Sequence, residues 1–243
     1  MKLRAHALLC VGWATFWASG AAAQSVTVKD GDWSASFEDP TDRYGHAIMG
    51  DLPEWGRLCL SGPPGAACVT LPRTSVFEDM APRLHDVDGD GAPEAIVVES
   101  TFTAGAALVI YRLRGGDLER IATPPIGTRS RWLAPAAITD LDGDGLVELA
   151  YIDRPHLAKR LRVWRYVDGV LVHVADQPNL TNHKIGEPFI SGGLRNCGAG
   201  PEIVTASGNW RELVATVLKD GALESRVLEP FSIAALQRVM ACA

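Results

Sequence analysis

The sequence predicts an all-β fold, namely a small β-propeller with four blades of four antiparallel strands. Three observations lead to this prediction. Short runs of Val, Ile, Leu and aromatic residues, bounded by turn residues, recur along the chain and are typical of strands. An acidic loop at 85–94 returns 54 residues later at 139–148, and such repetition is typical of propellers. Residue pairs suited to tight hairpin turns also recur. These pairs are Gly115-Gly116, Asp168-Gly169 and Asp220-Gly221.

Residues 1–23 have the pattern of a secretory signal peptide. Lys2 and Arg4 form a positive region, an apolar stretch follows, and small residues offer a cleavage site after Ala23. A retained membrane anchor is the alternative. We therefore expect a secreted or periplasmic protein whose mature part, residues 24–243, is one domain without a membrane span.

The charge of the mature chain argues against nucleic acid as a partner. Without Lys2 and Arg4, the 23 basic residues fall to 21, against 29 acidic ones, which gives a net charge of −8. Nucleic-acid binding needs a basic surface.

We expect each repeat to form four strands, A to D, with the acidic loop between A and B and the glycine-containing turn between C and D. The blades are expected at approximately 33–72, 81–122, 132–175 and 187–228. In the first blade, residues 46–50 are expected to form strand B. Residues 25–28 are expected to join the last sheet and close the ring. The tail, 229–243, contains helical spacing at 232–240. A β-sandwich is the alternative, but the fixed offset favours radial repetition.

The two acidic loops carry carboxylates at alternating positions. Positions one, three, five and nine hold acids, and glycines at positions four and six let the backbone wrap closely. Hard cations such as Ca²⁺ take six to eight oxygen ligands. The alternative is a solvated acidic turn, in which four close carboxylates would repel one another. The loop is not an EF-hand, because Val97 and Tyr151 stand where that loop needs a Glu and the flanks are strands.

The loops, their place between strands and the repeat length resemble FG-GAP/VCBS repeats, the unit of integrin-α-type propellers and of many bacterial exported proteins. The specific motif occurs in two of the four units. The resemblance implies two Ca²⁺ sites. Their ligands would be Asp86, Asp88, Asp90, the Ala92 carbonyl and Glu94, and likewise Asp140, Asp142, Asp144, the Leu146 carbonyl and Glu148. Position nine is commonly Asp in that family, so the two glutamates depart from it. Four units are fewer than the usual seven, so both a small ring and assembly with another chain stay open.

The mature chain has four cysteines, which suggests two disulfides in an exported protein. Cys59 and Cys68 flank a turn in a hairpin pattern, so we pair them, and this leaves Cys197 with Cys242. Other pairings and buried free thiols are alternatives. A third copy of the loop, at 194–206, has lost its acids and gained Cys197. Our hypothesis is that the second bridge holds this loop where calcium holds the others.

We assign no catalytic residue, because the metalloprotease, nucleophile-elbow, P-loop and dinucleotide-binding motifs are all absent from the sequence. In the predicted strand order, the acidic loops occupy one face, and basic loops collect on the opposite face. The candidate ligand-binding residues there are Arg73, Arg129, Arg131, Trp132, Arg154, His156, His183 and Lys184. They suit an anionic ligand, such as an acidic glycan, a phosphate group or an acidic protein patch. Solvated loop charges with a packed Trp are the alternative.

The sequence therefore predicts an exported, calcium-stabilised propeller that acts as a binding or scaffold module. The alternative is a polysaccharide lyase or hydrolase with an active site at the ring axis. A subunit of a larger envelope assembly is a third possibility. A deep pocket with a Tyr/His/Arg cluster would favour an enzyme, and a shallow basic face would favour binding.

Overall fold

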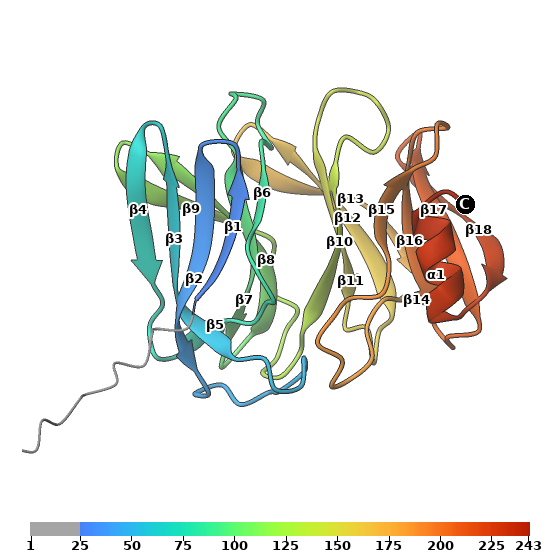
Figure 1. Cartoon of the computed structure of the whole chain (residues 1–243), viewed down its shortest axis with the longest axis horizontal. Coiled ribbons are helices and arrows are strands. Elements are labelled where there is room, and N and C mark those ends of the chain that lie inside the picture. Colours follow the sequence, from blue (N-terminus) through green and yellow to red (C-terminus); the bar gives the residue numbers. More distant parts are fainter. Residues whose placement is uncertain (1–24) are drawn as a thin grey trace, which may run out of the picture.

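The computed structural model describes residues 25–243 as antiparallel sheets with a short C-terminal helix (Figure 1). This confirms the predicted all-β class. The predicted signal peptide lies outside the described residues. Within residues 25–243, no helix combines the length and the apolarity needed to cross a bilayer.

The first sheet contains two structural units. The first unit comprises β1 (Val26–Asp30), β2 (Trp33–Thr41), β3 (Glu54–Gly62) and β4 (Gly65–Thr70). The second comprises β5 (Ser75–Phe77), β6 (Arg83–His85), β7 (Glu94–Thr101), β8 (Gly105–Arg114) and β9 (Asp117–Ala122). A single residue pair, Trp55 opposite Phe77, joins β3 to β5 and makes the two units one nine-stranded sheet.

Two predictions for the first unit are wrong. The N-terminal strand does not join the last sheet, because β1 pairs antiparallel with β2 across a turn at Gly31. This hairpin closes a short loop, which costs far less chain entropy than closing the whole ring. Residues 46–50 form a turn rather than strand B, with Ala47 and Gly50 at positive φ and a Gly50 N–H to Ala47 carbonyl bond of 3.2 Å. β1 supplies the fourth strand instead.

The third and fourth units follow the predicted repeat more closely. The third is β10 (Leu133–Thr139), β11 (Glu148–Asp153), β12 (Arg160–Val167) and β13 (Val170–Pro178). The fourth is β14 (Leu180–Thr181), β15 (Gly193–Asn196), β16 (Pro201–Ser207), β17 (Glu212–Lys219) and β18 (Ala222–Pro230). The three recurring hairpin turns have positive φ at both central residues, as predicted.

Strand A is interrupted in the second and fourth units, which moves their starts from the predicted 81 and 187. β5 and β6 both pair with β7, and residues 78–82 lie between them. β14 and β15 both pair with β16, and residues 182–192 lie between them. In the third unit, β10 stays continuous with a bulge near Pro135. The inserted segments later contribute to the candidate site.

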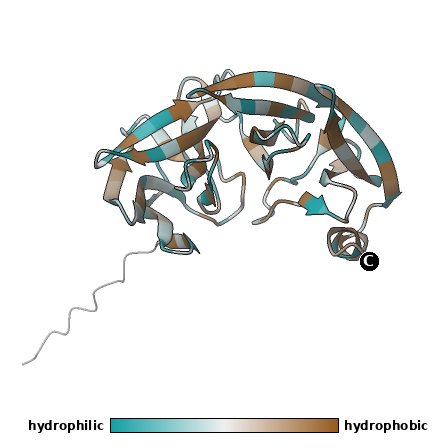
Figure 2. Ribbon diagram, turned by 90° about the horizontal axis from the view of Figure 1, so that it is seen from above, coloured by the Kyte–Doolittle hydropathy of each residue, from teal (hydrophilic) through white to brown (hydrophobic). Residues whose placement is uncertain are grey.

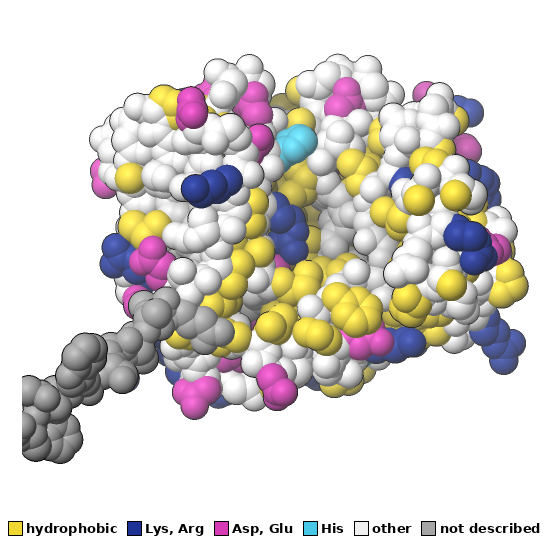
Figure 3. Space-filling model, in the orientation of Figure 1, with side chains coloured by type: hydrophobic (Ala, Val, Ile, Leu, Met, Phe, Trp, Pro, Cys, Tyr) yellow, Lys and Arg dark blue, Asp and Glu magenta, His cyan; other side chains and the backbone are white. Residues whose placement is uncertain are grey.

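The units are arranged in an arc when seen from above (Figure 2). The first and fourth units are not hydrogen-bonded through strands within the described part of the chain. Their loops meet at one end, where the Gly186 N–H donates to the Ile48 carbonyl at 2.9 Å. Figure 3 shows the concave side hollowed between the two halves, and a groove of about 530 Å³ there is lined by β6, β10 and β15.

The core consists of layers between neighbouring units. Ala95 and Val97 of β7 pack toward the first unit, while Ile96 and Val98 pack toward the third. In the third unit, the same alternation along β11 places Ala150, and the residues on its side of the strand, against the fourth unit. Central strands are therefore buried on both faces, which explains their continuous apolar runs.

The helix α1 (Ile233–Met240) confirms the predicted helical tail. The Ser232 side chain caps it by accepting the Ala235 N–H at 3.0 Å. Ala235 and Val239 pack against Val204 and Leu213 of the fourth unit.

Candidate functional site

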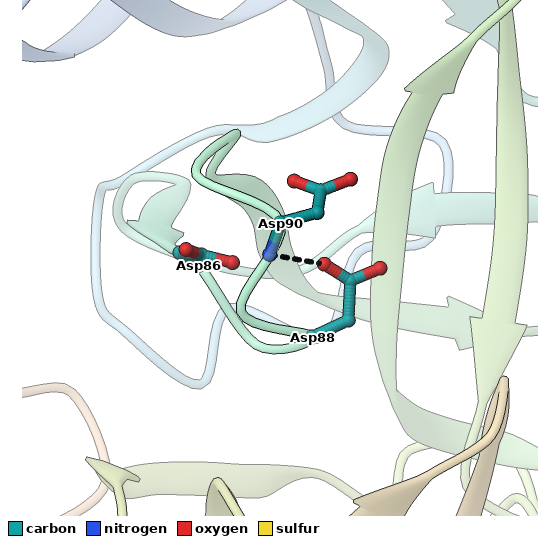
Figure 4. Close-up of side chains that lie close together, drawn as sticks. All are labelled: Asp86, Asp88 and Asp90. Carbon is teal, nitrogen blue, oxygen red and sulfur yellow. Dashed lines mark hydrogen bonds between the residues drawn. The ribbon is translucent and has the colours of Figure 1, made fainter.

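The first acidic loop lies at the upper end of the sheets in Figure 1 and is folded around its own carboxylates. Asp86 accepts the N–H groups of Gly89 and Gly91 at 2.8 and 2.9 Å. Both glycines have positive φ, so this wrapping depends on glycine at each position. The Asp90 N–H donates to Asp88 at 3.2 Å, the contact drawn in Figure 4.

The carboxylates of each loop converge, but not all the predicted ones take part. Asp86, Asp88 and Asp90 offer oxygens within 4.8 Å of one another in the first loop. Asp140, Asp142 and Glu148 do so in the second. Glu94 and Asp144 stand outside these groups. Clustered carboxylate oxygens are the donor set that Ca²⁺ and Mg²⁺ prefer, so the residues present fit a hard divalent cation.

Glu94 sits beneath the first loop and is buried. Its Oε2 accepts the Val87 N–H at 2.9 Å. The pKa of Glu94 is raised to about 7, chiefly by burial and in part by the charges of the three nearby aspartates, while the hydrogen bond from Val87 opposes the shift. Arg112 reaches this loop only at Asp88, 2.6 Å away, and its other end binds Glu119 at 2.8 Å.

The second loop repeats most of these backbone bonds but has a different basic neighbour. The Gly143 and Gly145 N–H groups donate to Asp140 at 2.7 and 2.9 Å. Arg165, opposite the loop's glutamate on β12, contacts three carboxylates at once. Its distances are 2.5 Å to Glu148, 2.6 Å to Asp142 and 2.8 Å to Asp144.

The third loop confirms the predicted second disulfide. Cys197 and Cys242 are bonded, with their Cα atoms 5.5 Å apart, and Cys59 and Cys68 form the other predicted bridge. Glu202, the counterpart of Glu94, pairs with Arg226 at 2.5 Å and with Arg195 at 2.7 Å. Hydrogen bonding to Arg226 is the main cause that lowers the pKa of Glu202.

A second candidate site lies at the opposite end, where loops of the first, third and fourth units surround a cavity of about 240 Å³. Its lining residues are His46, Ile48, Ser130, Arg131, Trp132, Arg154, His156, Leu157 and Ile185. Arg154 is neutralised by the buried Asp153 at 2.7 Å. Arg131 donates only to the Ser130 carbonyl, at 3.1 Å, and forms no ion pair with a carboxylate of residues 25–243.

Two side-chain pairs that contain histidine border this cavity. His46 Nδ1 lies 2.5 Å from Oε1 of Glu78, a buried carboxylate that also accepts the Ser100 hydroxyl. Burial raises the pKa of Glu78, while His46 and Ser100 oppose the shift. His156 Nε2 lies 3.1 Å from His183 Nδ1. Burial lowers the pKa of His183 and, together with the His183 charge, lowers that of His156 to about 4.

The structure brings together only part of the predicted ligand face. Arg131, Trp132, Arg154 and His156 line the cavity. His183 lies behind it, with its ring 4.9 Å from that of Trp132. The other three are elsewhere. Arg129 packs over Phe102, Lys184 packs over Trp210, and Arg73 is exposed outside the cavity lining.

Sequence reasoning missed His46, Glu78, Ile48 and Ile185. His46 belongs to a segment that looked like a strand, and Glu78 belongs to the insertion within strand A. No sequence signal marked His46 as part of a site, whereas His156 and His183 lie in loops that the sequence predicted.

Comparison with known families supports the repeat assignment. The family model of the FG-GAP-like repeat matches residues 86–151, which span the first two acidic loops and the strands between them. This confirms the resemblance for that stretch. No curated protein matches the chain.

Proposed function

We propose that the mature chain is an exported, four-bladed propeller-like scaffold, stabilised by Ca²⁺ at two loops, that binds a small anionic ligand at the opposite end. The observation that carries the binding function is Arg131, a guanidinium that has no carboxylate partner among residues 25–243 and lines a cavity. Two disulfides support folding in an oxidising compartment, which fits a secreted or periplasmic location.

Calcium at the two loops is supported by their converging oxygens and by the FG-GAP-like repeat match. The converging carboxylates would hold the ion together with the backbone carbonyls of Ala92 and Leu146; they are Asp86, Asp88 and Asp90 in the first loop and Asp140, Asp142 and Glu148 in the second. Bound there, the ion would neutralise carboxylates that otherwise repel one another. The loops would then act as staples at one end and leave the other end for binding.

Chelation tests the calcium proposal. A ligand present at about 100 times its Kd adds about 2.7 kcal/mol of stability, so EDTA should lower the melting temperature by roughly 5–10 °C. Replacing Asp88 and Asp142 together by Ala should abolish this difference. Asp117→Ala, an exposed acid outside the loops, should keep it. A melting curve that EDTA leaves unchanged in the unmodified protein would remove calcium from the proposal.

The anion-binding proposal is tested at Arg131. Isothermal titration with glucuronate and with inorganic phosphate should show binding, and Arg131→Glu should weaken it at least about tenfold through like-charge repulsion. Arg211→Glu reverses an exposed arginine outside the cavity and serves as the matched control. Equal binding by the two variants would count against the cavity as the anion site.

A lyase or hydrolase is the second candidate function, and one observation favours it. His46 is oriented by the buried carboxylate of Glu78 and borders the cavity, an arrangement suited to general acid–base chemistry. Incubation with a polyuronate, followed by assay of new reducing ends and of unsaturated products, separates the two functions. An enzyme should release products that His46→Gln suppresses, whereas a binding module should release none.

A further inference from the structure

The histidine pair at the cavity fixes which of its ring nitrogens can accept a hydrogen bond. His183 Nε2 lies 2.8 Å from the Glu187 carbonyl, which can only accept, so this nitrogen carries the proton. Burial lowers the pKa of His183, so the ring is neutral and its Nδ1 is an acceptor. His156 Nε2 must therefore donate to it across 3.1 Å.

The outcome is one defined acceptor atom on a residue that lines the cavity. His156 is also neutral near pH 7, because its pKa is lowered to about 4, so its remaining nitrogen, Nδ1, carries a lone pair. Nδ1 makes no hydrogen bond to residues 25–243, whereas Nε2 is occupied by His183. A ligand that meets His156 must therefore donate a hydrogen bond to it.

The other polar groups of the cavity favour a different chemical group on the ligand. Arg131 offers donors and a positive charge, and no carboxylate of the described residues pairs with it. His46 is held by Glu78 through Nδ1, and its Nε2 makes no hydrogen bond within the described chain. An ammonium group would be repelled by the Arg131 guanidinium, so a hydroxyl is the donor that fits beside it.

From these groups we infer that the cavity binds a small hydroxy acid, with its carboxylate on Arg131 and a hydroxyl donated to His156 Nδ1. The volume, about 240 Å³, is below the roughly 300–1,000 Å³ of pockets for drug-sized ligands, so the occupant is a single small ring or chain. The apolar side chains of Ile48 and Trp132 would cover its carbon face. This inference rests on the proposed anion-binding function and names its ligand class.

A matched set of three ligands tests the inference by titration calorimetry. Glucuronate carries both a carboxylate and hydroxyls, glucose carries only hydroxyls, and cyclohexanecarboxylate carries only the carboxylate. An acceptor that the ligand covers without pairing is penalised, so glucuronate should bind roughly tenfold or more tighter than cyclohexanecarboxylate. His156→Phe should remove this advantage, so that the two acids bind alike.

The outcomes separate the two levels of the proposal. If cyclohexanecarboxylate binds as tightly as glucuronate, the hydroxy-acid inference is overturned while anion binding stands. If glucose binds as tightly as glucuronate, or no acid binds, the anion-binding function itself fails. Because the ligand set is measured on the unmodified protein, the inference stays testable even if His156→Phe does not fold.

Discussion

The first and second acidic loops share their carboxylate spacing and most of their backbone hydrogen bonds, but different arginines reach them. Arg112 contacts the first loop at Asp88 alone and divides its charge with Glu119. Arg165 contacts three carboxylates of the second loop. The third loop has lost its aspartates, and two arginines hold its remaining glutamate. From the first to the third, positive charge supplied by the chain increasingly replaces the charge that a metal would bring.

This series indicates that one backbone design can be stabilised in three ways. A loop without an internal cation depends on a bound one, because buried carboxylates need neutralisation. A loop with an arginine inside it is stable alone, but a metal must displace the guanidinium. The third loop is closed by a disulfide and its one glutamate is already paired with two arginines, so it needs no metal. We therefore expect calcium to bind more tightly at the first loop than at the second, and not at the third.

The largest effect should come from breaking the third loop's staple. Replacing Cys197 and Cys242 by Ser opens a bridge with a sequence separation of 45 residues, which should cost about 4 kcal/mol. Urea unfolding of oxidised protein measures this loss, and added Ca²⁺ should not restore it. Opening Cys59–Cys68, with a separation of 9, should cost less, about 3 kcal/mol. A larger loss at the shorter bridge would contradict the assignment of the C-terminal bridge as the main staple.

Arg165→Gln should have the next largest effect. It leaves the fully buried Glu148 without its cation, which should cost about 3 kcal/mol, the lower end for buried pairs because Arg165 itself is partly exposed. In EDTA the variant should therefore unfold at clearly lower urea concentration. Saturating Ca²⁺ should recover most of the loss, because the freed carboxylates can then bind the ion.

The control for this variant is Arg160→Gln, which removes a more exposed and longer ion pair with Asp176 and should cost less than about 1 kcal/mol. If Ca²⁺ leaves Arg165→Gln as unstable as EDTA does, the guanidinium is not standing in for a metal.

Features encoded by neighbouring residues could be predicted from the sequence. The acidic loops, the Asp168-Gly169 type of turn and the capped tail helix each follow from residues within one short segment. The second disulfide followed from the count of cysteines once the first pair had been placed. These features can be predicted because each depends on residues that lie close together in the sequence.

Features that depend on distant contacts could not be predicted in this way. The place of β1 is an exception, because the Gly31-Asp32 pair between β1 and β2 is a local hairpin signal that the ring-closure prediction overlooked. The cavity joins His46, Arg131 and His156 from three separate loops, and no fixed spacing relates them. Arg165 looked like an ordinary strand residue until its pairing opposite Glu148 was known.

Arg112→Gln is the smallest and most discriminating change, because it probes the loop that has the least internal charge. The Arg112 guanidinium contacts Asp88 and the exposed Glu119, and it lies 3.3 Å from the Tyr166 hydroxyl of the next unit. Its removal should cost only about 1 kcal/mol in EDTA, the upper end for pairs that water reaches. Freeing Asp88 should tighten calcium binding at the first loop by about two- to threefold, since its ion pair with Arg112 no longer competes with the metal.

Calorimetric titration of this variant beside Arg165→Gln measures both gains in one experiment. The gain should be smaller for Arg112→Gln, because its guanidinium contacts one carboxylate of its loop where Arg165 contacts three. Equal gains would mean that the number of carboxylates an arginine contacts does not decide how strongly it competes with calcium. The proposed difference in calcium affinity between the two loops would then be wrong.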